Sequence, residues 1–369
     1  MNRKPIFFSV FLSLLLFAGR VRAQEPGYMY RDAAAFPVYG RVAESVSGRY
    51  ERLPADYAQR TRGAVWDISH HAAGIAVRFR SDSPSIRLRW VSAGLMSMSH
   101  MTDTGSRGLD LYIREPGDVH WRFAGSAMPR RDTLNDREVI AHMTPMMREY
   151  LVYLSLYEGV KRLEIGVEEG CVVEAPVLDS PRKGSPVVMY GTSILQGGCA
   201  SRPGMAFTNI LSRELDREVV NLGFSGNGRL DLEIAEWMAQ AENPALYVLD
   251  ALPNCHSEWV EERLEPFFRI LRRAHPDVPV VFVEHAPYPA AAFDRQRADD
   301  IAARNAAQRA VYERLRKNGE KRIFYIKGEK LLGQDGEDTV EGIHFTDLGM
   351  VRYAEAVLPT LKKALKSSR

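Results

Sequence analysis

A serine and a histidine that lie far apart in the chain carry the side chains best suited to nucleophilic catalysis. Ser193 directly follows the apolar run 187–190 on a glycine-bounded turn, and His344 has a carboxylate, Glu341, three residues before it. A serine hydroxyl is too weakly acidic to attack a carbonyl unaided, so it needs an adjacent base that a third group orients. If the two segments meet in space, this pairing predicts a hydrolase.

Two further segments offer hydrogen-bond donors for a developing negative charge. Segment 221–228 contains Gly223 and Gly226 directly after an apolar run, and Asn254 ends segment 250–254. Glycines after a strand leave the backbone N–H groups approachable, and an asparagine amide can donate from the next strand end. Both features are typical of an oxyanion site.

The elements that must position these residues change character at the polar, proline-bounded segment 181–186. Before it, apolar residues alternate with charged ones, as in Ile86, Leu88 and Trp90, and long helical patterns are absent. This period of two predicts an antiparallel all-β sandwich, jelly-roll-like, between about residues 28 and 177.

After segment 181–186, short apolar strands alternate with amphipathic helices, which predicts a parallel sheet covered by helices on both faces. Ligands of such sheets bind at the carboxyl ends of the strands, where Ser193, Gly226, Asn254 and His344 are expected. The expected strands are 187–190, 219–222, 246–249, 280–283 and 323–326, and the expected helices are 205–215, 230–238, 259–274, 297–316 and 347–365.

In this order the segments resemble the four sequence blocks of the SGNH (GDSL-type) hydrolases, over about residues 185–369. The context of Ser193 is not the G-x-S-x-G elbow of ordinary α/β-hydrolases. The resemblance implies a flavodoxin-like three-layer α/β/α fold, with Ser193 as nucleophile and His344 as base. It also implies an oxyanion hole formed by the Ser193 N–H, the Gly226 N–H and the Asn254 side chain, with Gly223 as the competing glycine.

The chain departs from the family pattern at two positions. Thr192 replaces the Asp of the Gly-Asp-Ser motif, and Glu341 stands where an Asp usually precedes the histidine by three residues. Glutamate is one methylene longer and can still orient an imidazole. We rank Glu341 first as the triad acid, Asp338 second and a Ser-His pair without an acid third.

A second resemblance lies in the β-rich half. The segment Gly108–Tyr112 is similar to the Gly-x-Asp-Leu-Tyr motif of the β-domain that precedes one bacterial subgroup of these hydrolases. Asp110 and Tyr112 are expected to serve packing and hydrogen bonding within that domain. For the nearby His100 we expect a structural role in the β-domain rather than contact across the domain interface.

The N-terminus has the pattern of a secretory signal. Arg3 and Lys4 precede an apolar stretch from Ile6 to Ala18, and small residues near Ala23 suit a signal peptidase. The predicted organisation is a signal peptide at 1–23, a β-sandwich domain at 24–180 and a hydrolase domain at 185–369. A single membrane span is the alternative, but the stretch falls short of the ~20 apolar residues that a span needs.

Composition narrows the choice of partners. The chain carries 49 basic and 47 acidic residues, and four of the basic ones lie in segment 1–23. Its removal leaves a net charge of −2, which does not favour a nucleic-acid partner or an anionic membrane surface. Three cysteines are too few for a disulfide scaffold. We weigh three small buried thiols against a Cys199–Cys255 bond and favour the thiols.

The leading hypothesis is a secreted or periplasmic serine esterase acting on short acyl groups. By analogy with the family, we expect acetyl esters of carbohydrates as its substrates. His256, Glu284 and His285 lie at predicted strand ends and are candidate substrate contacts. No zinc-protease motif, carboxylate cluster or phosphate loop is present, so we expect no cofactor and no metal. The alternatives are an inactive carbohydrate-binding protein on the same scaffold and a lipid or thioester acylhydrolase. The oligomeric state is left open.

Overall fold

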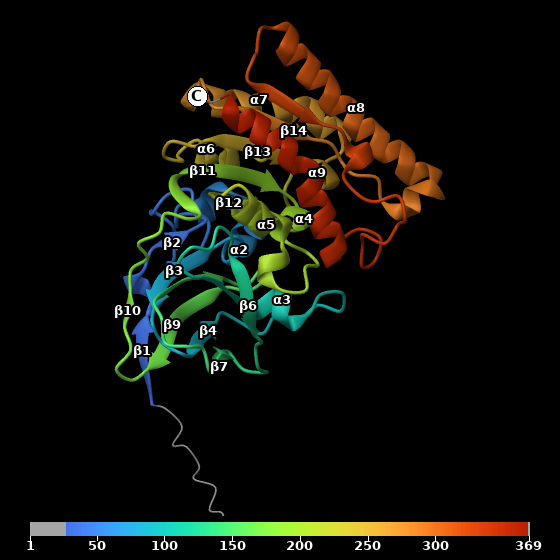
Figure 1. The fold of residues 1–369 in the computed structure, drawn as a ribbon. Coiled ribbons are helices and arrows are strands. Elements are labelled where there is room, and N and C mark those ends of the chain that lie inside the picture. The colour runs from blue at the N-terminus through green and yellow to red at the C-terminus, as the bar shows by residue number, and fades with distance from the viewer. Residues whose placement is uncertain (1–26, 368–369) are drawn as a thin grey trace, which may run out of the picture.

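The structure, a computed structural model, describes residues 27–367. The predicted signal peptide 1–23 therefore lies outside the described residues. The strands of a β-sandwich and the strands of an α/β sheet occupy opposite ends of the molecule (Figure 1). Among the described residues, no helix combines the length and apolarity that crossing a bilayer requires.

The first half forms two antiparallel sheets that face each other. One sheet has the order β1-β9-β4-β7 and the other β10-β3-β8-β5-β6, with β2 paired to β3. The alternation in β4 works as predicted, because Leu88 and Trp90 are fully buried between the sheets whereas Arg87 and Arg89 pair with Asp136 outside. The strands are β1 (Tyr28–Asp32), β2 (Val38–Tyr39), β3 (Ala76–Ser81), β4 (Ile86–Ser92), β5 (Leu109–Arg114), β6 (Arg122–Ala127), β7 (Leu134–Ile140), β8 (Arg148–Tyr153), β9 (Val160–Glu168) and β10 (Val173–Glu174).

Three short helices interrupt this half, namely α1 (Tyr57–Arg60), α2 (Gly63–Ser69) and α3 (Asp103–Arg107). Their one or two turns are too short for helical periodicity to show in the sequence. Leu53, Tyr57 and Val65 do not pack in the sandwich but in the core of the α/β sheet beside Tyr190 and Trp237. A segment of the first half therefore helps to build the layer that supports the candidate site.

The second half is the expected three-layer α/β/α arrangement. Its five parallel strands have the order β12-β11-β13-β14-β15, which is the flavodoxin-like order. Helices α6, α7 and α8 cover one face, and α5 and α9 cover the other. The strands are β11 (Arg182–Gly191), β12 (Arg217–Gly223), β13 (Leu246–Asp250), β14 (Val280–Val283) and β15 (Ile323–Ile326). The helices are α4 (Ser193–Gln196), α5 (Phe207–Glu214), α6 (Leu232–Met238), α7 (Ser257–Ala274), α8 (Arg295–Lys317) and α9 (Asp347–Lys366).

The segment expected to separate the two halves is part of a strand. Residues 182–186 begin β11, and Arg182 pairs with Arg217 of β12 before a register shift leads into the buried run from Val187. Proline and glycine in 181–186 therefore mark a strand irregularity rather than a linker. The carboxyl ends of β11, β12 and β13 meet at one edge of the sheet, where this strand order brings ligands.

The buried carboxyl group of Asp250 makes stability depend on pH. Burial raises its pKa to about 7, an effect that the hydrogen bond from the Tyr353 hydroxyl (2.9 Å) opposes only partly. Because the pKa of Asp250 is higher in the folded than in the unfolded state, this group stabilises the folded protein. Its contribution is full below the unfolded pKa of about 4 and is lost as the pH rises through about 7. The change Asp250→Asn keeps an acceptor for Tyr353 and removes this titration. We expect the melting temperature of the variant to fall less than that of the wild type between about pH 5 and about pH 8. Equal falls would contradict the assignment.

Candidate active site

The structure brings Ser193 and His344 together from opposite ends of the α/β half. The Nε2 atom of His344 lies 2.8 Å from the Ser193 Oγ, and its Nδ1 atom lies 2.6 Å from the Glu341 Oε1. The His344 backbone N–H also donates to Glu341 Oε1, at 3.1 Å. A hydroxyl, an imidazole and a carboxylate linked in this way can activate a serine for attack on a carbonyl.

The position of Ser193 follows from the end of β11. Ser193 is the first residue of α4, and the Thr192 hydroxyl caps this helix by accepting a hydrogen bond from the Ile194 N–H at 3.3 Å. Thr192 is thus the N-cap residue of α4, a role that an aspartate at this position could also fill. The next loop approaches so closely that a Cβ atom on Gly228 would lie 2.0 Å from the Gly191 carbonyl oxygen.

Backbone hydrogen bonds hold the His344 loop against the Ser193 loop. The Cys199 N–H donates to the Phe345 carbonyl (3.0 Å), and the Phe345 N–H donates to the Gly198 carbonyl (3.3 Å). Helix α9 begins directly after this pairing, with Thr346 as its N-cap. Two main-chain contacts of Phe345, the residue after the base, therefore join the base-bearing loop to the nucleophile loop.

Of the two candidate acids, Glu341 contacts the imidazole and Asp338 does not. Asp338 is 1% exposed and accepts hydrogen bonds from the Gly333 N–H (2.8 Å) and from Arg352 (3.1 Å). Its carboxylate thus organises the loop before the histidine. The longer glutamate side chain reaches Nδ1 from position 341, which makes the extra methylene compatible with an orienting role.

The candidate oxyanion donors lie on the turns after β12 and β13. Gly226 has a φ of +67°, and its N–H makes no hydrogen bond to any residue of the described range 27–367. The competing Gly223 N–H is already used, because it donates to the Asn221 Oδ1 at 2.9 Å. Asn254 ends a 3-10 turn (Leu252–Asn254). Among residues 27–367 its Nδ2 donor has no hydrogen-bond partner, and its Oδ1 acceptor is buried without one. The Gly226 N–H and the Asn254 side-chain amide are therefore free to donate to a substrate oxygen, whereas the Gly223 N–H is not.

The three candidate substrate contacts have different surroundings. Glu284 is 2% exposed, and Tyr325 and the Gly328 N–H donate to it at 2.7 and 2.9 Å. His256 is exposed and packs edge-on against Trp259. His285 is 1% exposed, and burial lowers its pKa to about 4, so its ring is neutral.

His285 borders a cavity of about 610 Å³ between loop 287–293, α8 and loop 332–338. Tyr288 lines this cavity and also a neighbouring one of about 330 Å³ that reaches Ile343, the residue before His344. The larger cavity is mostly apolar and includes the highly exposed Phe293. The smaller cavity, which reaches the residue before the base, is a candidate place for part of a substrate, and the larger one shares Tyr288 with it.

Several residues at the site come from the β-rich half and were not predicted. The Tyr157 hydroxyl donates to the Ser193 carbonyl at 3.2 Å. The Gln196 Nε2 lies 3.0 Å from the His71 Nδ1, and the Gln196 Oε1 accepts from the Ser225 N–H at 3.0 Å. Burial lowers the pKa of His71 to about 3, so this ring is neutral and serves as an acceptor. These contacts tie the nucleophile helix to the turn that carries Gly226.

His100 is a further residue of this kind, and the expectation that its role stays within the β-domain is wrong. Its ring faces the ring of His344, with centroids 5.3 Å apart. Cys199 lies nearby, and all three cysteines of the chain are free, so the alternative of a Cys199–Cys255 bond is also wrong. The sequence held no spacing that could signal this cluster.

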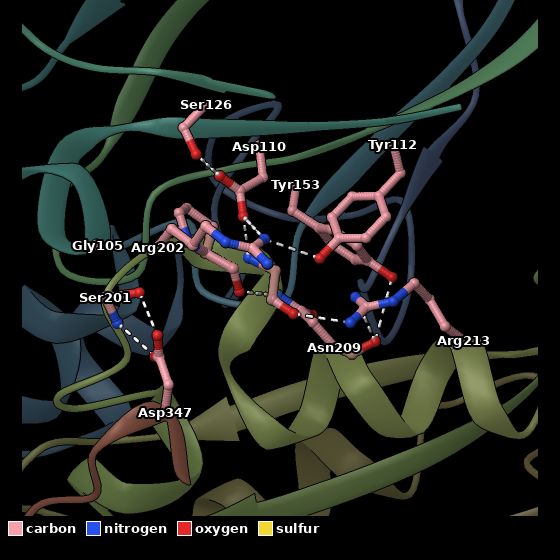
Figure 2. Close-up of polar contacts among 12 residues, drawn as sticks. Gly105, Asp110, Tyr112, Ser126, Tyr153, Ser201, Arg202, Asn209, Arg213 and Asp347 are labelled. Carbon is pink, nitrogen blue, oxygen red and sulfur yellow. Dashed lines mark hydrogen bonds and ion pairs between the residues drawn. The ribbon is translucent and has the colours of Figure 1, made fainter. Parts of the chain in front are cut away.

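The Gly-x-Asp-Leu-Tyr motif contacts the α/β half directly, as Figure 2 shows. Asp110 is fully buried and accepts hydrogen bonds from Arg202 (2.8 Å), the Gly204 N–H (2.7 Å) and Ser126 (2.6 Å). Arg202 also donates to the Tyr112 hydroxyl at 2.9 Å. Asp110 and Tyr112 thus serve packing and hydrogen bonding, as expected, but their partners also include residues of the α/β half.

The same contacts reach both loops of the candidate site. Ser201, next to Arg202, binds the Asp347 carboxylate through its N–H (2.9 Å) and its hydroxyl (2.5 Å). Asp347 is the first residue of α9 and follows His344 by three positions. Loop 197–206 thus links the motif of the β-sandwich to the nucleophile helix before it and to the base-bearing loop.

We expect Asp110→Asn to weaken both stability and turnover. The amide cannot match the charge of Arg202. Removing one partner of a fully buried ion pair typically costs about 3–5 kcal/mol, and the loss here should be smaller because the Arg202 side chain is 21% exposed. Thermal unfolding and ester hydrolysis, measured well below the melting temperature, test this. Asp118→Asn is the matched control, since Asp118 pairs with Arg122 at the surface. Equal melting temperatures for the Asp110 and Asp118 variants would refute the role of the buried pair.

Comparison with known proteins agrees with this architecture. Residues 184–362 match the model of the GDSL-like lipase/acylhydrolase family, and residues 28–173 match the N-terminal region of SGNH-hydrolase-type esterases that carries the GxDLY motif. No curated protein matches the chain.

Solved structures are similar over nearly the whole chain. A GDSL-like lipase structure from Bacteroides ovatus is 32% identical, with a TM-score of 0.87 over 92% of this chain and 98% of that one. The salicylyl-acyltransferase SsfX3 of a tetracycline biosynthetic pathway is 20% identical (TM-score 0.74, 93% and 98% covered). A family two carbohydrate esterase from Cellvibrio japonicus is 14% identical (TM-score 0.58, 93% and 99% covered). The last two show the fold alone. The chain belongs to the GDSL-like (SGNH) hydrolase family, in the group with an N-terminal GxDLY region.

Proposed function

We propose that this protein is a serine esterase that hydrolyses short acyl esters, with acetyl esters of carbohydrate as its substrates. The observation that carries the proposal is the contact series Ser193–His344–Glu341, with 2.8 and 2.6 Å between the paired atoms. Membership of a hydrolase family supports the same conclusion.

In the proposed mechanism, His344 Nε2 takes the Ser193 proton while the serine oxygen attacks the ester carbonyl carbon. Glu341 accepts from the Nδ1–H, which fixes the tautomer and stabilises the imidazolium. The carbonyl oxygen gains negative charge and is held by the N–H groups of Ser193 and Gly226 and by the Asn254 amide. Collapse of this intermediate passes the proton to the leaving alcohol and leaves an acyl-serine, which water, activated by His344, then hydrolyses.

Asn254→Ala should lower kcat by roughly 10²- to 10³-fold, because one oxyanion donor is commonly worth that much. The KM should change much less, since the donor acts mainly on charge that forms in the transition state. Asn318→Ala, at the exposed end of α8, is the control. Steady-state kinetics on p-nitrophenyl acetate measure both constants. A kcat for Asn254→Ala within twofold of the control would remove Asn254 from the oxyanion site.

The carbohydrate part of the proposal rests on two kinds of support. The larger cavity presents Tyr288, which also lines the smaller cavity that reaches Ile343, and Phe293; aromatic rings can cover the apolar face of a sugar. Fold relatives include the family two carbohydrate esterase from Cellvibrio japonicus and an acetyl xylan esterase from Butyrivibrio proteoclasticus, at 14% and 9% identity.

An activity panel of acetylated xylan, acetylated pectin, acetylated peptidoglycan and nitrophenyl esters of increasing chain length tests the substrate class. The proposal predicts release of acetate from at least one polymer and falling rates as the acyl chain lengthens. Faster turnover of long acyl chains would favour the lipid or thioester acylhydrolase instead. The inactive carbohydrate-binding alternative drew its support from Glu341, and the contact of Glu341 with the His344 Nδ1 argues against it.

We further propose that the protein is exported after cleavage behind Ala23 and acts outside the cytoplasm. The basic start, apolar stretch and small residues of segment 1–23 support this proposal. The sandwich (24–180) and the hydrolase region (185–369) are proposed as its two domains. The proposed partner is an acylated carbohydrate or another small ester, with no nucleic acid and no membrane span after signal removal.

A further inference from the structure

Three side chains with nitrogen and sulfur donors converge beside Ser193. His100 comes from the β-sandwich, Cys199 from the loop after α4, and His344 from the loop before α9. One donor atom of each lies within 4.8 Å of the other two. Imidazole nitrogen and thiolate sulfur are the donors preferred by Zn²⁺ and by softer ions such as Cd²⁺.

Two of these three donors are free of competing partners. Within residues 27–367, the His100 ring and the Cys199 thiol have no hydrogen bond or ion pair. Tetrahedral Zn²⁺ with bonds of about 2.0–2.3 Å holds its donors about 3.5 Å apart, so the cluster must close by about 1 Å. His100 is partly exposed and makes no hydrogen bond to residues 27–367, which leaves its side chain room to rotate toward the other two.

We propose that His100, Cys199 and His344 form an inhibitory site for Zn²⁺ and related divalent ions, with water as the fourth ligand. The inhibitory part rests on the proposed function, because it requires His344 to be the base. Binding forms one metal–sulfur and two metal–nitrogen bonds and releases the Cys199 proton to solvent.

Inhibition follows whichever nitrogen of His344 the metal takes. A metal on Nε2 occupies the lone pair that would accept the Ser193 proton. A metal on Nδ1 displaces Glu341 and leaves the ring proton on Nε2, where it again blocks proton transfer. Both arrangements inactivate the imidazole without changing the fold, and removal of the ion restores it.

The test measures metal binding and activity separately on the full chain. Addition of CdCl₂ should produce the ultraviolet thiolate-to-cadmium absorption band with one ion bound per chain. ZnCl₂ should inhibit p-nitrophenyl acetate hydrolysis, and EDTA should reverse the inhibition. Cys199→Ser and His100→Gln should each raise the half-inhibitory zinc concentration at least tenfold, since even indirect partners of a metal ligand change affinity by roughly 10- to 100-fold.

Matched controls are Cys255→Ser, at a second buried thiol, and His120→Gln, at an exposed imidazole of the β-sandwich. Both should keep the wild-type zinc sensitivity and cadmium band. The site is refuted if the cadmium band persists in Cys199→Ser or is missing from the wild type. Because the His100 position is partly exposed, His100→Gln still gives an answer if Cys199→Ser does not fold. A wild type that binds cadmium but hydrolyses no ester would instead overturn the proposed function and leave the metal site standing.

Discussion

Ser193→Ala is expected to reduce ester hydrolysis by roughly 10⁴- to 10⁶-fold, which is the range for removing a serine nucleophile from a triad. The Oγ atom of Ser193 makes one hydrogen bond to the described residues, to the His344 Nε2, so its loss should leave the packing intact. Residual activity should be that of the oxyanion donors and of binding alone.

The measurement is the initial rate of p-nitrophenyl acetate hydrolysis, with thermal unfolding as the check on folding. The melting temperature of the variant should stay close to that of the wild type. A folded Ser193→Ala protein that turns over at even a tenth of the wild-type rate would rule out the acyl-enzyme mechanism.

Glu341→Gln is expected to lower kcat by roughly 10³- to 10⁴-fold. The amide can present its N–H₂ group to the His344 Nδ1, which favours the tautomer with the proton on Nε2, and that tautomer cannot accept the Ser193 proton. The Glu341→Gln substitution also removes the negative charge that stabilises the imidazolium. Glu341→Asp should recover part of the loss if the backbone allows the shorter carboxylate to reach Nδ1.

Asp338→Asn separates the two candidate acids. Asp338 contacts Arg352 and the Gly333 N–H rather than the imidazole, so its loss should lower the melting temperature more than it lowers kcat. Steady-state kinetics and thermal unfolding of both variants make the comparison. A larger fall in kcat for Asp338→Asn than for Glu341→Gln would reverse the ranking of the acids.

The sequence was most informative where a local pattern repeats. Period-two alternation in β4 and the helical stripe of α7, with Val260, Leu264 and Phe268 buried, report which face of each element is covered. Each pattern depends on a few neighbouring residues, so it can be recognised from the sequence without knowledge of the fold. The parallel α/β/α arrangement follows from the order of such elements.

The site was predictable to the extent that it lies at strand ends. Ser193, Gly226 and Asn254 follow β11, β12 and β13, and the parallel sheet brings those ends to one edge. His344 was expected at the same edge, but it lies in the loop before α9 and does not directly follow a strand. Its contact with Ser193 depends on backbone pairing between loops about 150 residues apart, for which no local pattern exists.

The contributions of the β-rich half could not be predicted from periodicity. Tyr157 and His100 reach the site because the sandwich packs against loop 197–206 and the His344 loop. One contact of that docking is the buried carboxylate of Asp110, which appears in the sequence only as one polar residue in a strand. The Gly-x-Asp-Leu-Tyr motif could be recognised in the sequence, but its contacts with the α/β half could not be predicted.

Labelling with a fluorophosphonate tests the central claim most directly, because the reagent reacts only with a serine whose hydroxyl is activated. Mass spectrometry of the wild-type protein should find one adduct, on the peptide that contains Ser193, and His344→Ala should slow its formation by at least roughly 10³-fold. An unlabelled wild-type protein, or an adduct on any other residue, would contradict the account.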